Sequence, residues 1–139
     1  MIIYFIVFLD RPKLNIKQTP RGDLIQGVDV TLTCTVDSRP YPHYIGWYNV
    51  TGLARHHFPC SNSTKTECSL RLSNIDILHS GTYQCEAFNG VGGSPVKRNK
   101  TIRVFGECML GNLYSKSSLF CQILIRVELY MNVLFTSTF

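Results

Sequence analysis

The chain has 139 residues, of which 45% are hydrophobic and six are cysteine, and its formal net charge at pH 7 is +5. This length suits one domain of about 95 residues with additional segments, and the hydrophobic content excludes a disordered chain. The basic residues are spread out and form no long run, so the composition gives little support to nucleic-acid binding. Six cysteines in so short a chain indicate an oxidising compartment.

The N-terminal segment, residues 1–11, is almost wholly apolar until the chain turns polar at Asp10. It is similar to the hydrophobic region of a signal peptide but has neither a basic leader nor a small-residue cleavage site. A membrane span is excluded because nine helical residues rise only about 14 Å, against a hydrocarbon core about 30 Å thick. Two interpretations remain: a degenerate signal, or an end created by a start codon inside a longer gene.

Alternating apolar residues predict strands in the middle of the chain. Within residues 27–36, Val30, Leu32 and Cys34 fall on one strand face, and the threonines between them fall on the other. Residues 83–87 repeat this alternation. The other predicted strands are residues 12–25 with a kink at Thr19-Pro20, 44–48, and 95–105 with Ile102 and Val104 facing inward. Leu70, Leu72 and Ile75 are expected to supply the core side of one more strand and of the turn that follows it.

Two loops are also predicted from composition. Residues 37–43 contain two prolines and are expected to lie outside helix and strand. Residues 89–94 form a glycine-rich hairpin in which Asn89-Gly90 suits a positive φ. A strand, not a helix, is expected after this hairpin, which argues against a phosphate-binding loop.

These elements together resemble the immunoglobulin superfamily, most closely its I-set (C2-type) domains, over residues 12–106. The resemblance divides the chain into an apolar leader or fragment end (1–11), an immunoglobulin-like domain (12–106) and an apolar tail (107–139). It rests on Cys34, Trp47, Cys85, Gly27 and the segments 69–75, 78–85 and 85–90.

The resemblance implies an all-β fold, a two-sheet antiparallel Greek-key sandwich. Its core is expected to contain a Cys34–Cys85 disulfide packed against Trp47, and the hydroxyl of Tyr83 is expected to hydrogen-bond to upstream backbone. The family usually has an aspartate, paired with a basic residue, where this chain has His79. We therefore expect that ion pair to be missing and the floor of the sandwich to be weaker, although an exposed pair is worth only about 0 to 1 kcal/mol.

The segment 55–68 contains His56, His57, Cys60 and Cys68. These are zinc-ligand types, but adjacent histidines on a strand point to opposite faces and the cysteines lie further apart than is usual in zinc modules. The alternative, which the spacing favours, is a second disulfide between Cys60 and Cys68. In the chain-entropy model this bridge contributes roughly 2.5 kcal/mol and a Cys34–Cys85 bridge roughly 4 kcal/mol.

Three sequons for N-glycosylation begin at Asn49, Asn62 and Asn99. Such sequons are used only in the secretory pathway, so they agree with the cysteine content. Asn49 follows the predicted strand 44–48 and is two residues after Trp47, so in a continued strand it would point to the same inward face as Trp47. A glycan on Asn49 therefore requires the strand to end or twist before this residue. We expect Asn49 to be the least accessible acceptor.

The kink in the first strand contains Arg21, Gly22 and Asp23, the tripeptide by which many matrix proteins engage integrins. A guanidinium and a carboxylate held apart by a glycine suit such a receptor. A glycine between two charges is also ordinary turn chemistry, and integrin recognition needs a protruding loop, which a kink beside a sheet does not readily offer. Both interpretations remain open.

The last predicted strand carries four cations, Lys97, Arg98, Lys100 and Arg103. Clustered cations bind the sulfates of heparan sulfate with a salt-sensitive affinity. Lysines on edge strands also protect a sheet from aggregation, which is the alternative explanation. A glycan on Asn99 is expected to obstruct glycosaminoglycan binding.

The tail contains Cys108, Cys121 and an apolar stretch, residues 119–135, which is interrupted by Gln122, Arg126, Glu128 and Asn132. The charged residues make this a poor transmembrane helix, since an arginine near the bilayer centre costs about 2.5 to 3.5 kcal/mol. Three interpretations remain: a membrane anchor, a peripheral or disordered extension, and a non-native tail from a truncated or misread gene.

No arrangement of nucleophile, paired carboxylates or metal ligands indicates an enzyme, and no cofactor motif is present. The resemblance implies an extracellular module, secreted or on the cell surface, for adhesion or receptor–ligand recognition, as a fragment of a larger multi-domain ectodomain. Its partner is expected to be a cell-surface or matrix protein, or a second copy. The alternatives are a spacer in a muscle-type filament, opposed by the sequons and second cysteine pair, and part of a receptor kinase or phosphatase ectodomain.

Overall fold

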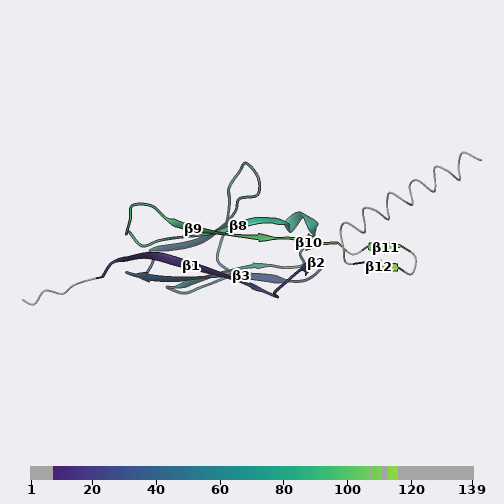
Figure 1. The fold of residues 1–139 in the computed structure, drawn as a ribbon, viewed down its shortest axis with the longest axis horizontal. Coiled ribbons are helices and arrows are strands. Elements are labelled where there is room, and N and C mark those ends of the chain that lie inside the picture. Colours follow the sequence, from purple (N-terminus) through teal and green to yellow (C-terminus); the bar gives the residue numbers. More distant parts are fainter. Residues whose placement is uncertain (1–7, 107, 111–112, 116–139) are drawn as a thin grey trace, which may run out of the picture.

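The computed structural model describes residues 8–106, 108–110 and 113–115. Two four-stranded sheets lie face to face (Figure 1). One sheet has the order β1 (Asp10–Thr19), β3 (Val30–Arg39), β7 (Glu67–Leu72), β6 (Asn62–Ser63), and the other has the order β5 (His56–Phe58), β4 (Tyr44–Asn49), β8 (Gly81–Phe88), β9 (Val96–Ile102). Neighbouring strands within each sheet are antiparallel, which confirms the predicted all-β sandwich.

Shorter elements complete the fold. β2 (Leu24–Ile25) pairs in parallel with β10 (Val104–Phe105), so the chain crosses from one sheet to the edge of the other after β1. A 3-10 helix, η1 (Ile77–His79), precedes β8. β11 (Cys108–Leu110) and β12 (Leu113–Ser115) pair with each other. Within the described part of the chain, no helix is long and apolar enough to span a membrane.

Several predictions made for the chain ends fall outside the described residues. These are the apolar leader up to residue 7, Cys121 and the apolar stretch 119–135. The interpretations of both ends, and the proposed domain boundaries, stay predictions.

Most strand boundaries shift by a few residues from the sequence prediction, and two of the shifts change how the strands pair. The strand expected to end at residue 36 continues through part of the predicted loop to Arg39, which pairs with Asp10. This extension is possible because a residue before proline favours extended backbone and the first proline of the loop is Pro40. The strand expected over 95–105 is broken at Arg103, where the chain stops pairing with β8 and begins to pair with β2.

Alternating side chains of β3 and β8 meet in the core between the sheets. Trp47, Cys34, Cys85 and Cys68 are fully buried. The remaining core positions are mostly aliphatic and include Leu14, Leu24, Val30, Leu32, Val36, Leu70, Leu72, Ile75, Ile102 and Val104. The core therefore contains the apolar face predicted for residues 27–36.

The glycine-rich hairpin after β8 is anchored through Asn89. Gly90 has φ of +85°, as the Asn-Gly pair predicts. The Asn89 side chain is buried, and its Nδ2 donates to the main-chain oxygens of Asp10 at 2.7 Å and Pro40 at 3.3 Å. This one amide therefore holds three segments together at one end of the sandwich.

Candidate recognition surfaces

Both predicted disulfides are present. Cys34 and Cys85 are bonded across the two sheets with their Cα atoms 6.4 Å apart, and Cys60 and Cys68 are bonded with their Cα atoms 5.4 Å apart. The second bridge settles the choice left open by the sequence, because it occupies both sulfurs that zinc would need. Among the described residues, no group of three or more candidate metal ligands is found.

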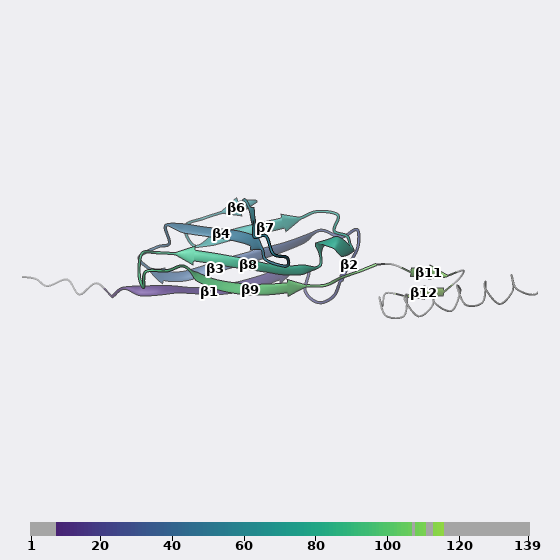
Figure 2. The ribbon, with the colours of Figure 1, turned by 90° about the horizontal axis from the view of Figure 1, so that it is seen from above.

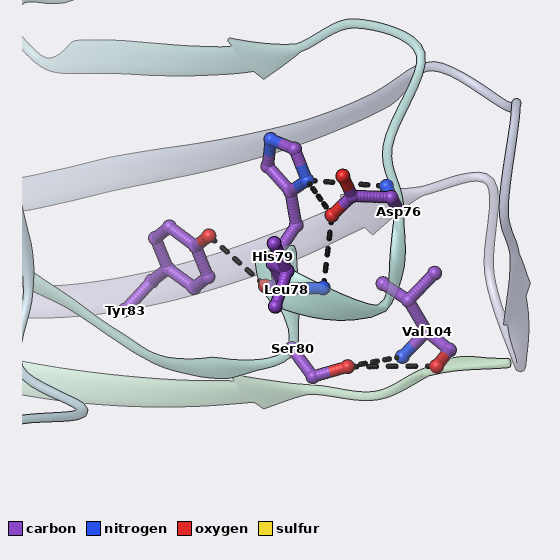
Figure 3. Close-up of polar contacts among 6 residues, drawn as sticks. All are labelled: Asp76, Leu78, His79, Ser80, Tyr83 and Val104. Atoms are coloured by element: carbon purple, nitrogen blue, oxygen red, sulfur yellow. Dashed lines mark hydrogen bonds and ion pairs between the residues drawn. The ribbon is translucent and has the colours of Figure 1, made fainter.

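We use the term floor for the end of the sandwich at which η1 precedes β8, and its contacts are centred on η1 (Figure 3). Asp76 is the N-cap of this helix, and its Oδ1 accepts a hydrogen bond from the Leu78 main-chain N–H at 2.9 Å. His79 Nδ1 lies 3.1 Å from the Asp76 main-chain nitrogen and 2.8 Å from Asp76 Oδ1. An unprotonated Nδ1 accepts from that N–H, and a protonated Nδ1 donates to the carboxylate. His79 thus makes a local pair in place of the aspartate pair usual in the family.

Two further contacts tie this helix to the strands on either side. The Tyr83 hydroxyl donates to the His79 main-chain oxygen at 3.0 Å, and burial raises the pKa of that phenol. Ser80 Oγ accepts from the Val104 main-chain N–H at 2.9 Å (Figure 3). The helix is therefore fixed to β8 and β10 at once.

Two exposed carboxyl groups at this end have lowered pKa values. The hydrogen bond with His79 lowers the pKa of Asp76, and that from the Leu78 main chain adds to the effect. The hydrogen bond from Arg71, followed by that from the Asn74 main chain, lowers the pKa of Asp29. Both groups therefore favour folding when they are ionised.

The three sequon asparagines occupy different settings. Asn62 lies exposed on β6 and makes no side-chain hydrogen bond among the described residues. Asn99 lies exposed on β9, and its Oδ1 accepts from Gln84 Nε2 at 2.9 Å. Asn49 is half-buried at the end of β4, and its Oδ1 accepts from the Thr51 main chain at 2.9 Å.

The integrin-type tripeptide lies in the connection between β1 and β2. Gln18 Nε2 donates to the Gly22 main-chain oxygen at 3.0 Å, and Gly22 has φ of +88°. Arg21 and Gly22 line a groove together with Lys100 of β9, and Asp23 lines the next groove along. The tripeptide is exposed, but it lies against a neighbouring strand.

The four cations predicted as one patch do not share one environment. Lys97 lies 3.9 Å from the carboxylate of Glu86 on the outer face of the sheet. Arg98 points the other way, and its Nη1 donates to the main chain of β1 at 2.6 Å. Lys100 and Arg103 line a groove at the edge of the sandwich. The alternation of a strand separates neighbouring side chains in this way.

The outer face of the sheet that contains β4 and β8 carries a cluster we call the tyrosine–arginine face: Tyr44, Tyr48, Arg55, His57 and Glu86. The Arg55 guanidinium lies 3.4 Å above the centre of the Tyr48 ring and forms an ion pair with Glu86, whose side chain is only 9% exposed. The hydroxyls of Tyr44 and Tyr48 are hydrogen-bonded. The His57 ring lies 5.1 Å from that of Tyr48. Arg55 is thus held in place from two sides.

Gly46 makes room for this cluster. A Cβ atom at this position would overlap the ring of Tyr44. Burial, followed by the hydrogen bond with Tyr48, raises the pKa of Tyr44. The absence of a side chain at Gly46 therefore allows Tyr44 to lie along the sheet and reach Tyr48.

We did not predict the tyrosine–arginine face from the sequence. One signal was available in the sequence: Tyr44 and Tyr48 have even residue numbers on the strand and Trp47 has an odd one. The two tyrosines therefore point to the face opposite from the buried Trp47. No local signal indicated Arg55, because it lies in the loop before β5 and meets Glu86 only through tertiary structure.

The chain is similar to known proteins that contain immunoglobulin domains. The family described as "Immunoglobulin domain" matches residues 11–89. The chain is 29% identical over 80 residues to the B-cell receptor CD22 of Mus musculus, a match that covers 58% of this chain and 8% of that protein. It is 35% identical over 72 residues to the human MAM domain-containing glycosylphosphatidylinositol anchor protein 2, covering 52% of this chain and 7% of that protein. The chain thus corresponds to a small part of each relative.

Among solved structures, the fold is similar to a three-domain fragment of titin, I67–I69 in an E-to-A mutated variant. The TM-score is 0.57 at 18% identity, and the match covers 75% of this chain and 36% of the titin fragment. This likeness supports the sandwich architecture alone. The I-set subtype stays a prediction.

Proposed function

The chain belongs to the immunoglobulin domain family, and from that premise we propose that it is an extracellular, non-enzymatic module that recognises a protein partner. We propose further that it forms part of a larger ectodomain, since the matched relatives are much longer. The names of these relatives, a B-cell receptor and a glycosylphosphatidylinositol anchor protein, support a place at the cell surface.

The observation that carries the extracellular location is the pair of disulfides. Both sulfur pairs are joined within one small domain. Structural disulfides persist in oxidising compartments and are rare in the cytosol. A spacer in a cytosolic filament is therefore the weaker alternative, and the exposed sequons at Asn62 and Asn99 favour the same choice.

We assign partner recognition to the tyrosine–arginine face. Tyrosine and arginine are enriched among the residues that dominate protein–protein binding energy. Arg55 is already held over Tyr48 and against Glu86, so little side-chain freedom remains to be lost on binding. Stable protein contacts bury about 800 Å² on each partner, so the partner would also contact residues around this cluster.

The location is tested by expressing the full chain with an added secretion signal. Peptide mapping of the alkylated secreted protein should find the Cys34–Cys85 and Cys60–Cys68 disulfides, and the protein should lose mass with an N-glycosidase. A folded product in which Cys34, Cys85, Cys60 and Cys68 are free thiols, and which carries no glycan, would contradict the extracellular proposal and favour the filament spacer.

The face is tested by screening the tagged chain against cells that each display one cell-surface protein, with a second copy of this chain included. For the protein that binds, Tyr48→Ala and Arg55→Ala should each weaken binding by about tenfold or more. Arg71→Ala is the matched control, because Arg71 forms an exposed ion pair with Asp29 on the other sheet. Equal losses for Arg55→Ala and Arg71→Ala would remove the assignment.

A further inference from the structure

β1 and β9 run along the same side of the sandwich, one at the edge of each sheet (Figure 2). Within the described residues, β1 pairs only with β3, and β9 pairs only with β8. The space between them is bounded at one end by the hydrogen bond from Arg98 to the Leu14 main-chain oxygen. At the other end it is bounded by the parallel pairing of Leu24 with Val104.

Two adjoining hollows occupy this space, with volumes of about 370 and 430 Å³. Both are lined by Gln18, Gly22 and Lys100, so they form one continuous feature that we call the basic edge groove. Its walls come from segments far apart in sequence, the region around the first kink and the end of β9.

Four cations line the basic edge groove: Lys17, Arg21, Lys100 and Arg103. None of them forms an ion pair among the described residues, and Asp23 is the one acidic residue in the lining. By contrast, three cations elsewhere, Arg55, Arg71 and Lys97, are paired with carboxylates. Other described cations are also unpaired, but the groove brings four such side chains, from both of its walls, to one feature.

We propose that the basic edge groove binds a sulfated polysaccharide chain. Cations stand on both walls, which suits a ligand that carries anionic groups along both of its sides. Lys100 of β9 and Arg103, just after it, are three residues apart, about 10 Å of extended chain, so they would meet sulfates on different sugars. The unpaired main-chain groups of two edge strands can hydrogen-bond to sugar hydroxyls.

This proposal concerns a second ligand and a surface separate from the tyrosine–arginine face. It rests on the proposed extracellular location, where such polysaccharides occur. The groove shares Lys100 and Arg103 with the patch predicted from the sequence, but it contains Lys17 and Arg21 and does not contain Lys97 and Arg98. Asn99 points to the face opposite from Lys100, so a glycan there leaves the groove open.

Heparin is the probe for the test, and the full chain is immobilised at about 0.15 M NaCl, where exposed charges more than about 8 Å apart are largely screened. We expect Lys17→Gln with Arg21→Gln, and Lys100→Gln with Arg103→Gln, each to weaken heparin binding by about tenfold. The matched control is Lys65→Gln with Lys97→Gln, which removes the same charge outside the groove and should change binding by less than about twofold. Equal weakening by the control would overturn the proposal.

Two further arms identify the ligand chemistry. Fully desulfated heparin should not bind, and poly-L-glutamate of matched charge should bind at least about tenfold more weakly than heparin. Binding of poly-L-glutamate as tight as that of heparin would show a general polyanion or acidic-peptide site and overturn the proposal, as would failure of the unmodified chain to bind heparin.

A measurement without variants keeps the test independent of their folding. Heparin should protect Lys17 and Lys100 of the unmodified chain from acetylation by an N-hydroxysuccinimide ester, read by mass spectrometry, and leave Lys65 and Lys97 reactive. Protection of all four lysines, or of none, would contradict the groove. Because these assays use purified protein, their outcome is separate from that of the secretion test.

Discussion

Trp47 donates its indole N–H to the main-chain oxygen of Cys68 at 3.0 Å, and both residues are fully buried. In one sheet, Cys68 of β7 lies opposite Cys34 of the neighbouring strand β3. In the other sheet, Trp47 of β4 lies opposite Cys85 of the neighbouring strand β8. The disulfide between Cys34 and Cys85 then connects β3 of the first sheet to β8 of the second. The two sheets are therefore joined at their centre by one covalent bond and one buried hydrogen bond.

We expect Trp47→Phe to lower the free energy of unfolding by about 1 to 3 kcal/mol, because it removes the buried hydrogen bond from the indole to the Cys68 oxygen, with a further loss from the smaller ring. Urea unfolding followed by far-ultraviolet circular dichroism measures this change. Tyr41→Phe, at a side chain that is 61% exposed, is the control and should change stability by less than about 0.5 kcal/mol. Equal stability of the two variants would show that the hydrogen bond contributes nothing.

The two disulfides should contribute unequally. In the chain-entropy model, replacing Cys34 and Cys85 by alanine costs roughly 4 kcal/mol, and replacing Cys60 and Cys68 costs roughly 2.5 kcal/mol, because the first bridge closes the longer loop. Urea unfolding of both double variants gives the order. A greater loss for the Cys60 and Cys68 variant would mean that packing of the buried Cys68, and not loop length, determines the contribution.

The lowered pKa of Asp76 predicts acid sensitivity at the floor of the sandwich. An aspartate whose pKa is lower in the folded than in the unfolded chain stabilises the fold fully above the unfolded value, about 3.9, and this stabilisation is lost as the pH falls through the folded value. Asp76→Asn should therefore reduce the dependence of stability on pH between about pH 5 and pH 2.

Denaturant unfolding at a series of pH values tests this prediction. Asp37→Asn is the control, since Asp37 is exposed and its side chain makes no hydrogen bond among the described residues. Asp76→Asn should flatten the acid limb of the stability curve more than Asp37→Asn does. Parallel curves for the wild type and Asp76→Asn would show that the pair with His79 does not contribute.

The settings of the three sequons predict which are used. We expect glycans on Asn62 and Asn99 of the secreted chain, because both side chains are exposed, and none on Asn49, which is half-buried and bonded to the Thr51 main chain. Enzymatic deglycosylation in ¹⁸O-labelled water followed by peptide mapping identifies the sites. A glycan on every copy of Asn49, or an Asn62 without a glycan, would contradict the prediction that exposure determines which sequons are used.

Much of the fold could be predicted because the core strands carry a period of two. The buried positions of β3 and β8 alternate in sequence as they do in space, so the faces containing Cys34 and Cys85 were evident. β5 and β6 were not delimited, because they are three and two residues long and mostly exposed. Strands so short leave too few alternating positions to define a face.

The sequence by itself determined the sandwich, the cysteine pairing and the buried tryptophan, since each depends on local alternation or on a spacing typical of the family. Only the tertiary structure decided which surface residues act together. Arg55 meets Glu86 on one face, and Lys17 and Arg21 meet Lys100 at one edge, because strands distant in sequence become neighbours there. Exposed side chains have no burial pattern that reveals such neighbours, so the folded arrangement of the strands had to place them.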